Sequence, residues 1–110
     1  MNNRKQQLER LLELVITSGY GGRRAEIENL LLDNAGIAHK YAKYALKNRW
    51  YRAEPIILGT PMTAVWYARD VIKGRWIDAE PVIMTQSNAA YNYAYGVIQG
   101  RWEQGEPVIA

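Results

Sequence analysis

The chain has 110 residues, which fits one domain, and 48% of them are hydrophobic, which excludes an intrinsically disordered protein. It contains no cysteine, which excludes disulfide bonds, thiolate zinc sites and a cysteine nucleophile. The formal net charge is +3, and no stretch has the pattern of a membrane span or a signal peptide. We therefore expect a cytoplasmic protein that makes no contact with a membrane.

The first predicted element is an amphipathic helix over residues 4–18. Aliphatic residues recur there at spacings of three and four, and most of the charged residues fall on the other face. The helix should end near Gly19, where a glycine-rich segment, residues 18–24, begins. That segment lacks the strand and the lysine-serine pattern of a phosphate-binding loop, so we interpret it as a turn between helices.

From residue 36 onward the sequence repeats at a fixed period. The three copies read YAKYALKNRWYRAEPII at 41–57, YARDVIKGRWIDAEPVI at 67–83 and YAYGVIQGRWEQGEPVI at 93–109. A fixed period of this size indicates a stack of similar units, each packed on its neighbours. We predict an all-α fold, a short α-solenoid that forms one domain. Its parts are an N-terminal helical cap (1–35), repeat 1 (36–61), repeat 2 (62–87) and repeat 3 (88–110).

The cap has the pattern of a degenerate fourth repeat. A shift by one period aligns Arg23 and Glu28 with Arg49 and Glu54, but Arg24 stands where the other copies have tryptophan. Terminal units of a stack are commonly atypical because one of their faces meets solvent. We therefore expect this unit to cap the stack.

Each repeat should contain a helix of about three turns, a tight corner and a short returning helix. In repeat 2 the first helix is predicted over residues 61–73, with the hydroxyl of Thr60 as its N-cap. The Glu-Pro pair after each corner suits the first turn of the short helix. The residues expected to end the first helices in a left-handed conformation are Asn48, Gly74 and Gly100.

The residues that recur in every copy are interpreted as scaffold. An arginine and a glutamate five residues apart can form a bidentate ion pair, within one repeat or between neighbours. The tryptophans should form a column that packs each corner onto the next. Tryptophans that stack nucleic-acid bases and arginines that bind phosphates are the alternatives, and the matched glutamates argue against the second. These scaffold residues are Arg49, Trp50, Glu54, Arg75, Trp76, Glu80, Arg101, Trp102 and Glu106.

No set of residues predicts catalysis. The single histidine, His39, lies in a lysine-rich helix without a repeated acidic partner. One histidine and widely spaced glutamates do not form a metal-binding cluster. We expect a protein that is not an enzyme and that has no cofactor and no metal.

The positions where the copies differ are the candidate partner-binding residues. Repeat 1 carries the excess of positive charge, with five basic residues and one acidic residue. Lys40, Lys43 and Lys47 recur at helical spacing and form a basic stripe, which Arg52 follows in the corner. Such a stripe is either a solvated helix face or a contact for an acidic partner. The aromatic residues that complete the candidate set are Tyr44, Tyr51, Trp66, Tyr91 and Tyr95.

The motif YAxxVIxGRWxxAEPxI resembles the short tandem repeats of bacteriophage-encoded accessory proteins. The resemblance covers residues 36–110, and its most specific part is the combination of GRW and EP. It implies an α-helical repeat fold and a phage origin, with the host cytoplasm as the location, and it implies no catalytic residues. Asn48 and Gly105 depart from the motif.

These observations are compatible with three functions. The first is a non-enzymatic scaffold that binds a partner protein with an acidic surface, as a phage accessory or host-interference factor would. The second is a nucleic-acid binder that uses Lys40, Lys43, Lys47 and Arg52. The third is self-assembly into homo-oligomers through the end of repeat 3, where Val108 and Ile109, next to Ala110, should be exposed.

Overall fold

The computed structural model describes residues 3–109, so residues 1–2 of the predicted cap and residue 110 of repeat 3 lie outside the described part. Every regular element within residues 3–109 is helical, which confirms the all-α class. The α-helices are α1 (Asn3–Ser18), α2 (Arg24–Leu31), α3 (Ala35–Tyr41), α4 (Glu54–Ile57), α5 (Pro61–Tyr67), α6 (Glu80–Ile83), α7 (Ser87–Tyr93) and α8 (Glu106–Ile109). The π-helical turns that continue α3, α5 and α7 are Ala42–Leu46, Ala68–Ile72 and Ala94–Ile98, and the 3₁₀ turns that precede α4, α6 and α8 are Tyr51–Ala53, Ile77–Ala79 and Glu103–Gly105.

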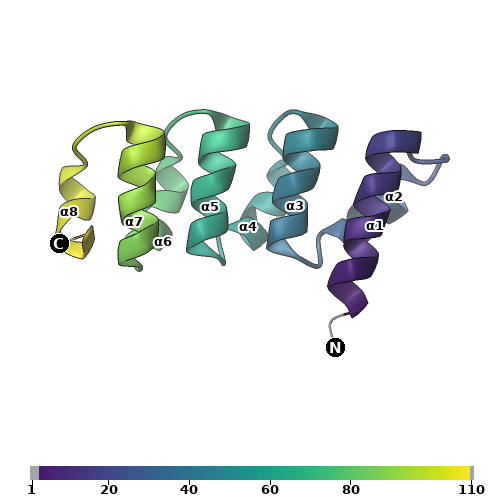
Figure 1. Ribbon diagram of the computed structural model, residues 1–110, viewed down its shortest axis with the longest axis horizontal. Helices are drawn as coiled ribbons and strands as arrows, with labels where there is room; N and C mark the ends of the chain where they lie inside the picture. Colours follow the sequence, from purple (N-terminus) through teal and green to yellow (C-terminus); the bar gives the residue numbers. More distant parts are fainter. Residues whose placement is uncertain (1–2, 110) are drawn as a thin grey trace.

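The helices lie in two rows (Figure 1). In the front row α1, α3, α5 and α7 stand side by side, and α2, α4, α6 and α8 form the second row behind them. Each front helix packs against the next one and against the short helix that follows it in the chain. The molecule measures 47 × 30 × 19 Å and has a radius of gyration of 15.0 Å, against about 13 Å for a compact domain of 100 residues. The molecule is therefore longest along the direction in which the front helices follow one another.

The core between the rows is built from positions that recur in every repeat. Tyr41, Tyr67 and Tyr93 are fully buried, and alanines on the same helix faces let neighbouring front helices approach closely. Removing a large buried side chain of this kind from water stabilises the fold by about 1.5–3 kcal/mol. The other buried repeat positions are Ala38, Ala64 and Ala90 in the front row, Trp50, Trp76 and Trp102 at the corners, and Ile57 and Ile83 in the second row.

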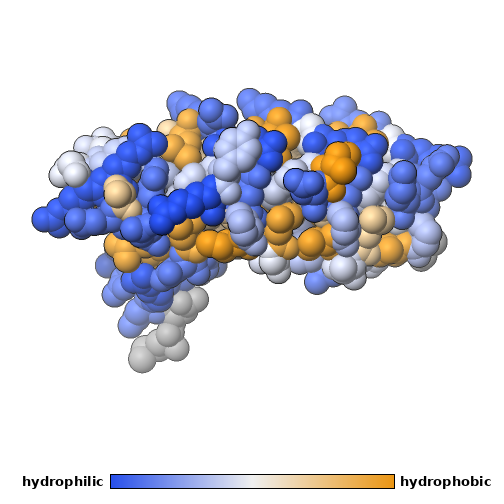
Figure 2. Space-filling model, turned by 180° about the vertical axis from the view of Figure 1, so that it is seen from behind, coloured by the Kyte–Doolittle hydropathy of each residue, from blue (hydrophilic) through white to orange (hydrophobic). Residues whose placement is uncertain are grey.

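The second row also presents aliphatic side chains on the outside. Figure 2 shows the molecule from behind, with hydrophobic residues gathered in a band along its length. Leu30 and Ile56, one period apart, are 41% and 38% exposed. Val82 and Val108 continue this column and are half-buried. The band follows from the repeat, because the same position of each short helix faces outward.

A hydrogen-bond network joins each repeat to the next. The hydroxyl of Tyr67 donates to Oε2 of Glu54 at 2.8 Å and accepts the backbone N–H of Trp50 at 2.7 Å. Glu54 also accepts two N–H groups of Arg49, at 2.9 and 2.8 Å. The tyrosine hydroxyl of one repeat thus donates a hydrogen bond to the buried carboxylate of the repeat before it. The same contacts recur one period later among Arg75, Trp76, Glu80 and Tyr93.

The first helix of each repeat ends in a widened turn. In repeat 2 the N–H groups of Lys73 and Gly74 both donate to the carbonyl of Ala68, at 2.7 and 3.2 Å. Lys73 adopts the left-handed conformation, with φ of 62°. The predicted left-handed position is therefore wrong by one residue. The N–H of Lys73 donates to the carbonyl five residues before it, and Lys73 itself is the left-handed residue. The left-handed residues are Lys47, Lys73 and Gln99, in place of Asn48, Gly74 and Gly100.

The N-cap residue predicted for repeat 2 is correct, but the capping hydrogen bond predicted for its hydroxyl is wrong. Thr60 stands at the N-cap with an extended backbone, and its carbonyl accepts the N–H of Ala64 at 2.9 Å, but its hydroxyl forms no capping bond. Pro61, the next residue, has no N–H that needs a partner. In repeat 1 a side chain does cap the helix, since Oδ1 of Asn34 accepts the N–H of Ile37 at 3.0 Å.

Helix α2 takes the second-row position before α4. Leu31 is fully buried in the core, and Glu28 accepts the hydroxyl of Tyr41 at 2.5 Å, as the glutamates of the later repeats do. The arginine differs from the prediction: Arg24, not Arg23, donates to Glu28, at 3.1 Å. Helix α2 begins at Arg24 and so places it one turn before Glu28.

Gly105 is where repeat 3 departs from the alanine of the other copies. Ala53 and Ala79 are fully buried at the equivalent positions. A Cβ added to Gly105 would overlap the indole ring of Trp102. With the ring in this place, repeat 3 requires glycine there.

Candidate functional site

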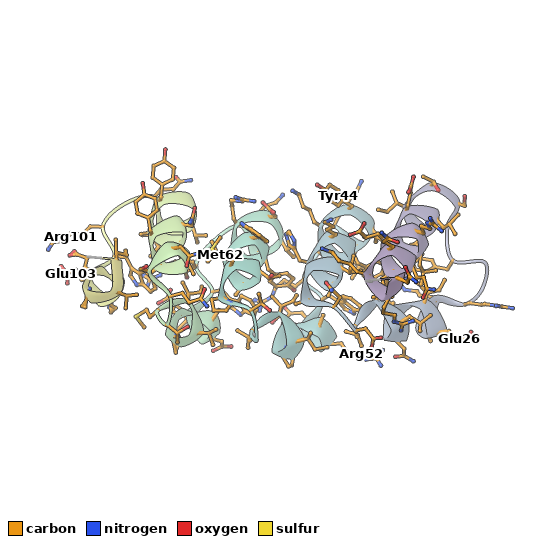
Figure 3. All side chains as sticks on the ribbon, turned by 60° about the horizontal axis from the view of Figure 1, so that its bottom comes forward. Glu26, Tyr44, Arg52, Met62, Arg101 and Glu103 are labelled. Carbon is orange, nitrogen blue, oxygen red and sulfur yellow. The ribbon has the colours of Figure 1, made fainter. Side chains whose placement is uncertain are left out.

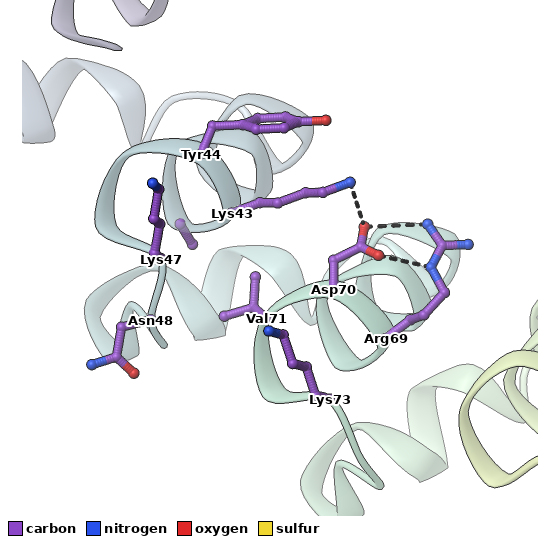
Figure 4. Close-up of a pocket in the computed structure, with 9 residues that line it drawn as sticks. Lys43, Tyr44, Lys47, Asn48, Arg69, Asp70, Val71 and Lys73 are labelled. Carbon is purple, nitrogen blue, oxygen red and sulfur yellow. Dashed lines mark hydrogen bonds and ion pairs between the residues drawn. The ribbon is translucent and has the colours of Figure 1, made fainter.

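Residues that differ between the copies line a hollow of about 550 Å³ between repeats 1 and 2 (Figure 4). The hollow lies where the first helices of the two repeats end, and we call it the basic hollow. It unites two of the predicted lysines and a predicted tyrosine with three residues that were not predicted. Its charged and aromatic lining residues are Lys43, Tyr44 and Lys47 from repeat 1 and Arg69, Asp70 and Lys73 from repeat 2.

The repeat itself places these residues. Lys43 and Arg69 are one period apart, as are Lys47 and Lys73, so each pair occupies one position of the unit. Lys47 and Lys73 are the left-handed residues of the two helix ends, with φ of 54° and 62°. Gln99 adopts the same conformation in repeat 3. All three repeats therefore share this backbone geometry, but only repeats 1 and 2 have a positively charged residue at the position.

Asp70 holds one side of the basic hollow together. Its carboxylate accepts Nε–H of Arg69 at 2.8 Å and lies 3.4 Å from Nζ of Lys43. Nε2 of His39, a buried residue, lies 3.1 Å from Oδ2 of Asp70. Burial acts to raise the pKa of Asp70, but these three partners outweigh it and lower that pKa to about 2. Asp70 is thus an anion, and its single charge offsets one of the two positive charges of Lys43 and Arg69.

His39 has the acidic partner that the repeat pattern did not reveal. Burial lowers the pKa of His39 against the opposing effect of Asp70, so the ring is neutral at pH 7 and donates its Nε2–H to that carboxylate. The ring also lies beside Trp66, with centroids 6.4 Å apart. This arrangement ties repeat 1 to repeat 2.

Lys47 and Lys73 differ from the other two cations of the hollow. Both are exposed, and neither forms an ion pair with a residue of the described part of the chain. Figure 4 shows Lys43 and Arg69 directed at Asp70, while Lys47 and Lys73 extend away from it. Four cationic side chains and one carboxylate line the hollow. The hollow therefore keeps a net positive charge, and these two lysines are its cations that form no ion pair with a described residue.

The predicted basic stripe is not one surface, which corrects that part of the prediction. Lys40 lines a different hollow, against Glu9 and Glu13 of α1. Arg52 donates a hydrogen bond to Oδ1 of Asn29. Figure 3 shows Arg52 and Tyr44 on opposite sides of repeat 1. Helical spacing placed the lysines on one helix, but Lys40 lies beside α1 in another hollow, and Arg52 lies on another side of the repeat.

The five predicted aromatic residues are all exposed, but they do not form one cluster. Tyr44 lies under Nζ of Lys43, 5.0 Å from it, and Tyr51 lies under the guanidinium of Arg49, at 4.7 Å. Trp66 contacts His39 between repeats 1 and 2. Tyr91 and Tyr95 stack on each other, with ring centroids 6.1 Å apart and planes at 11°.

The stacked tyrosines line a second hollow, of about 470 Å³, which we call the tyrosine hollow. Its lining residues carry no charge: Tyr91, Ala94, Tyr95, Gln99 and Gly100. A smaller hollow of about 210 Å³, the connecting hollow, lies between repeats 2 and 3. It shares Arg69 and Lys73 with the basic hollow and Gln99 with the tyrosine hollow. The three hollows therefore follow one another across the ends of the front helices.

The repeated tryptophans are interior residues. Trp50, Trp76 and Trp102 are 7%, 4% and 2% exposed, and each ring packs on the tyrosine of its own repeat with centroids 4.8–5.1 Å apart. Burial makes these rings unable to stack on nucleic-acid bases, so that alternative is wrong.

The repeated arginines pair with glutamates within their own repeats. The N···O distance of each closest contact is 2.8 Å. The ion pair in repeat 3 is the most exposed one, because the side chain of Glu106 is 39% exposed and those of Glu54 and Glu80 are 11% and 10% exposed. Val108 and Ile109, expected to be exposed, are half-buried against the core. Self-assembly through this end stays a prediction.

Helical spacing within repeat 1 does not identify Arg69, Asp70 and Lys73, because they lie on the next repeat. The signal was present: the positions one period after Lys43 and Lys47 are also basic. Among residues 3–109 no three His, Cys, Asp or Glu side chains form a group that could hold a metal ion. No helix of this part is both long and apolar enough to cross a lipid bilayer.

No protein-family model matches the chain, and searches of curated proteins and of solved structures return no significant match. Any function must therefore be inferred from the fold and from the geometry of the hollows.

Proposed function

We propose that the chain is a short α-solenoid without enzymatic activity that binds an acidic segment of a partner protein in the basic hollow. One observation carries the proposal: Lys47 and Lys73, at equivalent positions of adjacent repeats, are exposed in the same hollow without an ion-pair partner among the described residues. Two cations that line one hollow attract a negatively charged ligand.

A protein ligand fits this charge better than a nucleic acid does. The corner arginines are each bound to a glutamate, Lys43 and Arg69 are bound to Asp70, and Arg52 lies on another side. A nucleic-acid surface needs many cations along the backbone, and binding weakens steeply with salt in proportion to their number. Two available lysines supply a contact for one or two carboxylates.

The resemblance to phage accessory repeats belongs to the same proposal. An accessory or host-interference protein acts by occupying a surface of a host protein. A rigid scaffold whose variable residues gather at the helix ends suits that role, because the repeat can keep its core while the contact residues change.

A titration with a dye-labelled hexaglutamate peptide tests the proposal. We expect saturable binding at low salt, followed by fluorescence anisotropy. The double variant Lys47→Gln, Lys73→Gln should bind about threefold to tenfold more weakly. Glutamine is the matched replacement, because Gln99 has the same left-handed conformation in repeat 3. Lys40→Gln removes a lysine outside the basic hollow and should leave binding unchanged.

The same titration with a single-stranded oligonucleotide decides between the two ligand classes. For two contacts we expect a slope of about −1.4 when the logarithm of affinity is plotted against that of salt concentration. Tighter binding of the oligonucleotide than of the peptide, with a much steeper slope, would overturn the proposal in favour of nucleic acid. Equal binding of hexaglutamate by the wild type and the double variant would also overturn it.

A further inference from the structure

The three hollows together form a continuous surface whose chemistry changes from one end to the other. At the helix ends the position of Lys43 and Arg69 becomes Tyr95 in repeat 3, and the position of Lys47 and Lys73 becomes Gln99. Positive charge in repeats 1 and 2 thus gives way to neutral aromatic surface in repeat 3. We call this surface, from the basic hollow through the connecting hollow to the tyrosine hollow, the track.

We propose that the track binds one extended segment of a partner protein, with acidic residues in the basic hollow and proline in the tyrosine hollow. The inference rests on the proposed function, since it takes the acidic contact from there. It adds the conformation of the segment, its second contact and the distance between the two contacts.

The tyrosine hollow fits an extended proline-bearing chain. Tyr91 and Tyr95 are 54% and 74% exposed, their rings are nearly parallel, and Ala94 also lines the hollow. Aromatic grooves of this type bind polyproline-II segments, because the proline ring packs on the aromatic faces and the backbone carbonyls of the segment accept hydrogen bonds. Among the lining residues, Tyr91, Tyr95 and Gln99 have side-chain groups that can donate hydrogen bonds. The hollow has no charged lining residue, so it does not favour a second acidic group.

The geometry of the stack gives the separation of the two contacts. Packed helices lie about 8–10 Å apart. The basic hollow lies between repeats 1 and 2, and the tyrosine pair lies on repeat 3, so about one and a half helix spacings, or about 12–15 Å, separate the two contacts. An extended chain advances about 3.1–3.3 Å per residue. About four or five residues therefore separate the acidic residues from the proline.

Synthetic peptides test this spacing. Each peptide carries two glutamates and two prolines joined by a glycine-serine spacer of one, five or eleven residues, and binding is measured by fluorescence anisotropy. We expect the five-residue spacer to bind at least about fivefold more tightly than the one-residue spacer, because only the longer peptide can make both contacts at once. The eleven-residue spacer should bind more weakly than the five-residue spacer.

Two replacements identify the second contact. Replacing both prolines by glycine should reduce affinity about fivefold, and Tyr95→Ala in the protein should abolish the difference between the two peptides. Tyr51→Ala is the matched control, because Tyr51 is 68% exposed and lies outside the track. Circular dichroism of both variants verifies that they are folded.

The outcomes separate this inference from the proposed function. If the glutamates are required but proline, spacer length and Tyr95 have no effect, the extended bipartite segment is wrong and the acidic contact stands. If the double variant Lys47→Gln, Lys73→Gln binds the five-residue peptide as the wild type does, the acidic contact is wrong. Equal losses in Tyr95→Ala and Tyr51→Ala would also overturn the inference.

Discussion

The hydroxyl of Tyr67 is the residue-scale link between repeats. It satisfies two groups of the preceding repeat at once, the carboxylate of Glu54 and the backbone N–H of Trp50. Burial raises the pKa of Tyr67, and the bond to Glu54 adds to this effect, so the hydroxyl keeps its proton as a donor. Periodicity of the sequence identified the tyrosine as a core residue, but the hydroxyl contact follows only from the way the repeats stack.

Tyr67→Phe should lower the free energy of unfolding by about 2–4 kcal/mol. The change keeps the ring but leaves a buried N–H without a partner and removes a hydrogen bond to a carboxylate. Urea denaturation followed by tryptophan fluorescence measures the loss. Tyr44→Phe is the control, since Tyr44 is 51% exposed, and its effect should stay within about 0.5 kcal/mol. Equal effects of the two changes would show that the hydroxyl network does not stabilise the stack.

Acidification should destabilise the fold through Asp70. The pKa of Asp70 is about 2 in the folded chain, against an ordinary value of 3.8. The folded state therefore favours the ionised carboxylate over the protonated acid. A lowered pKa contributes stability that is present above about pH 4 and is lost as the pH falls towards 2. The side chain is 11% exposed, and the expected contribution is about 2 kcal/mol.

Urea denaturation of the wild type and of Asp70→Asn between pH 5 and pH 2 checks this contribution. The wild type should be more stable at pH 5, and the difference between the two proteins should shrink as the pH falls. A difference that stays constant over this range would contradict the assignment to the carboxylate of Asp70.

At the scale of the element, the sequence predicts the order of helix, corner and short helix correctly but misplaces how the first helix ends. Gly74 is the residue type that most easily takes a left-handed conformation, yet Lys73 takes it. The hydrogen bonds of the widened last turn outweigh this local preference, because the N–H groups of Lys73 and Gly74 both donate to the carbonyl of Ala68. Likewise, the bond between His39 and Asp70 could not be predicted, because neither residue recurs in the other copies.

Lys73→Gly should therefore stabilise the fold by about 1 kcal/mol, since a side chain in the left-handed region carries a steric cost that glycine lacks. Gly74→Ala should change stability by less than about 0.5 kcal/mol, because Gly74 has no positive φ and a Cβ there meets no atom within 4 Å. Thermal and urea denaturation of the two variants gives the comparison. The reverse order, with Gly74→Ala the costly change, would place the left-handed residue where the sequence alone predicted it.

At the scale of the whole molecule, the contacts run between neighbouring repeats, so the stack should tolerate removal of one complete unit. Deleting residues 62–87, the whole-unit deletion, brings Tyr93 to the position of Tyr67, beside Glu54 and Trp50. The network at this junction can then re-form with the same residue types. It cannot re-form after deletion of residues 62–74, the half-unit deletion, which shifts every later residue by half a period.

We expect the whole-unit deletion to give a cooperatively folded helical protein with a lower melting temperature, because a stack loses the interface energy of the missing unit. The half-unit deletion should fail to fold cooperatively, although it removes fewer residues. Circular dichroism at increasing temperature distinguishes the two. The whole-unit deletion also removes Arg69, Asp70 and Lys73 and thus one wall of the basic hollow, so it should fold and yet bind hexaglutamate more weakly. A folded deletion protein with unchanged affinity would locate the acidic contact elsewhere on the stack, and an unfolded one would show that the repeats are not interchangeable units.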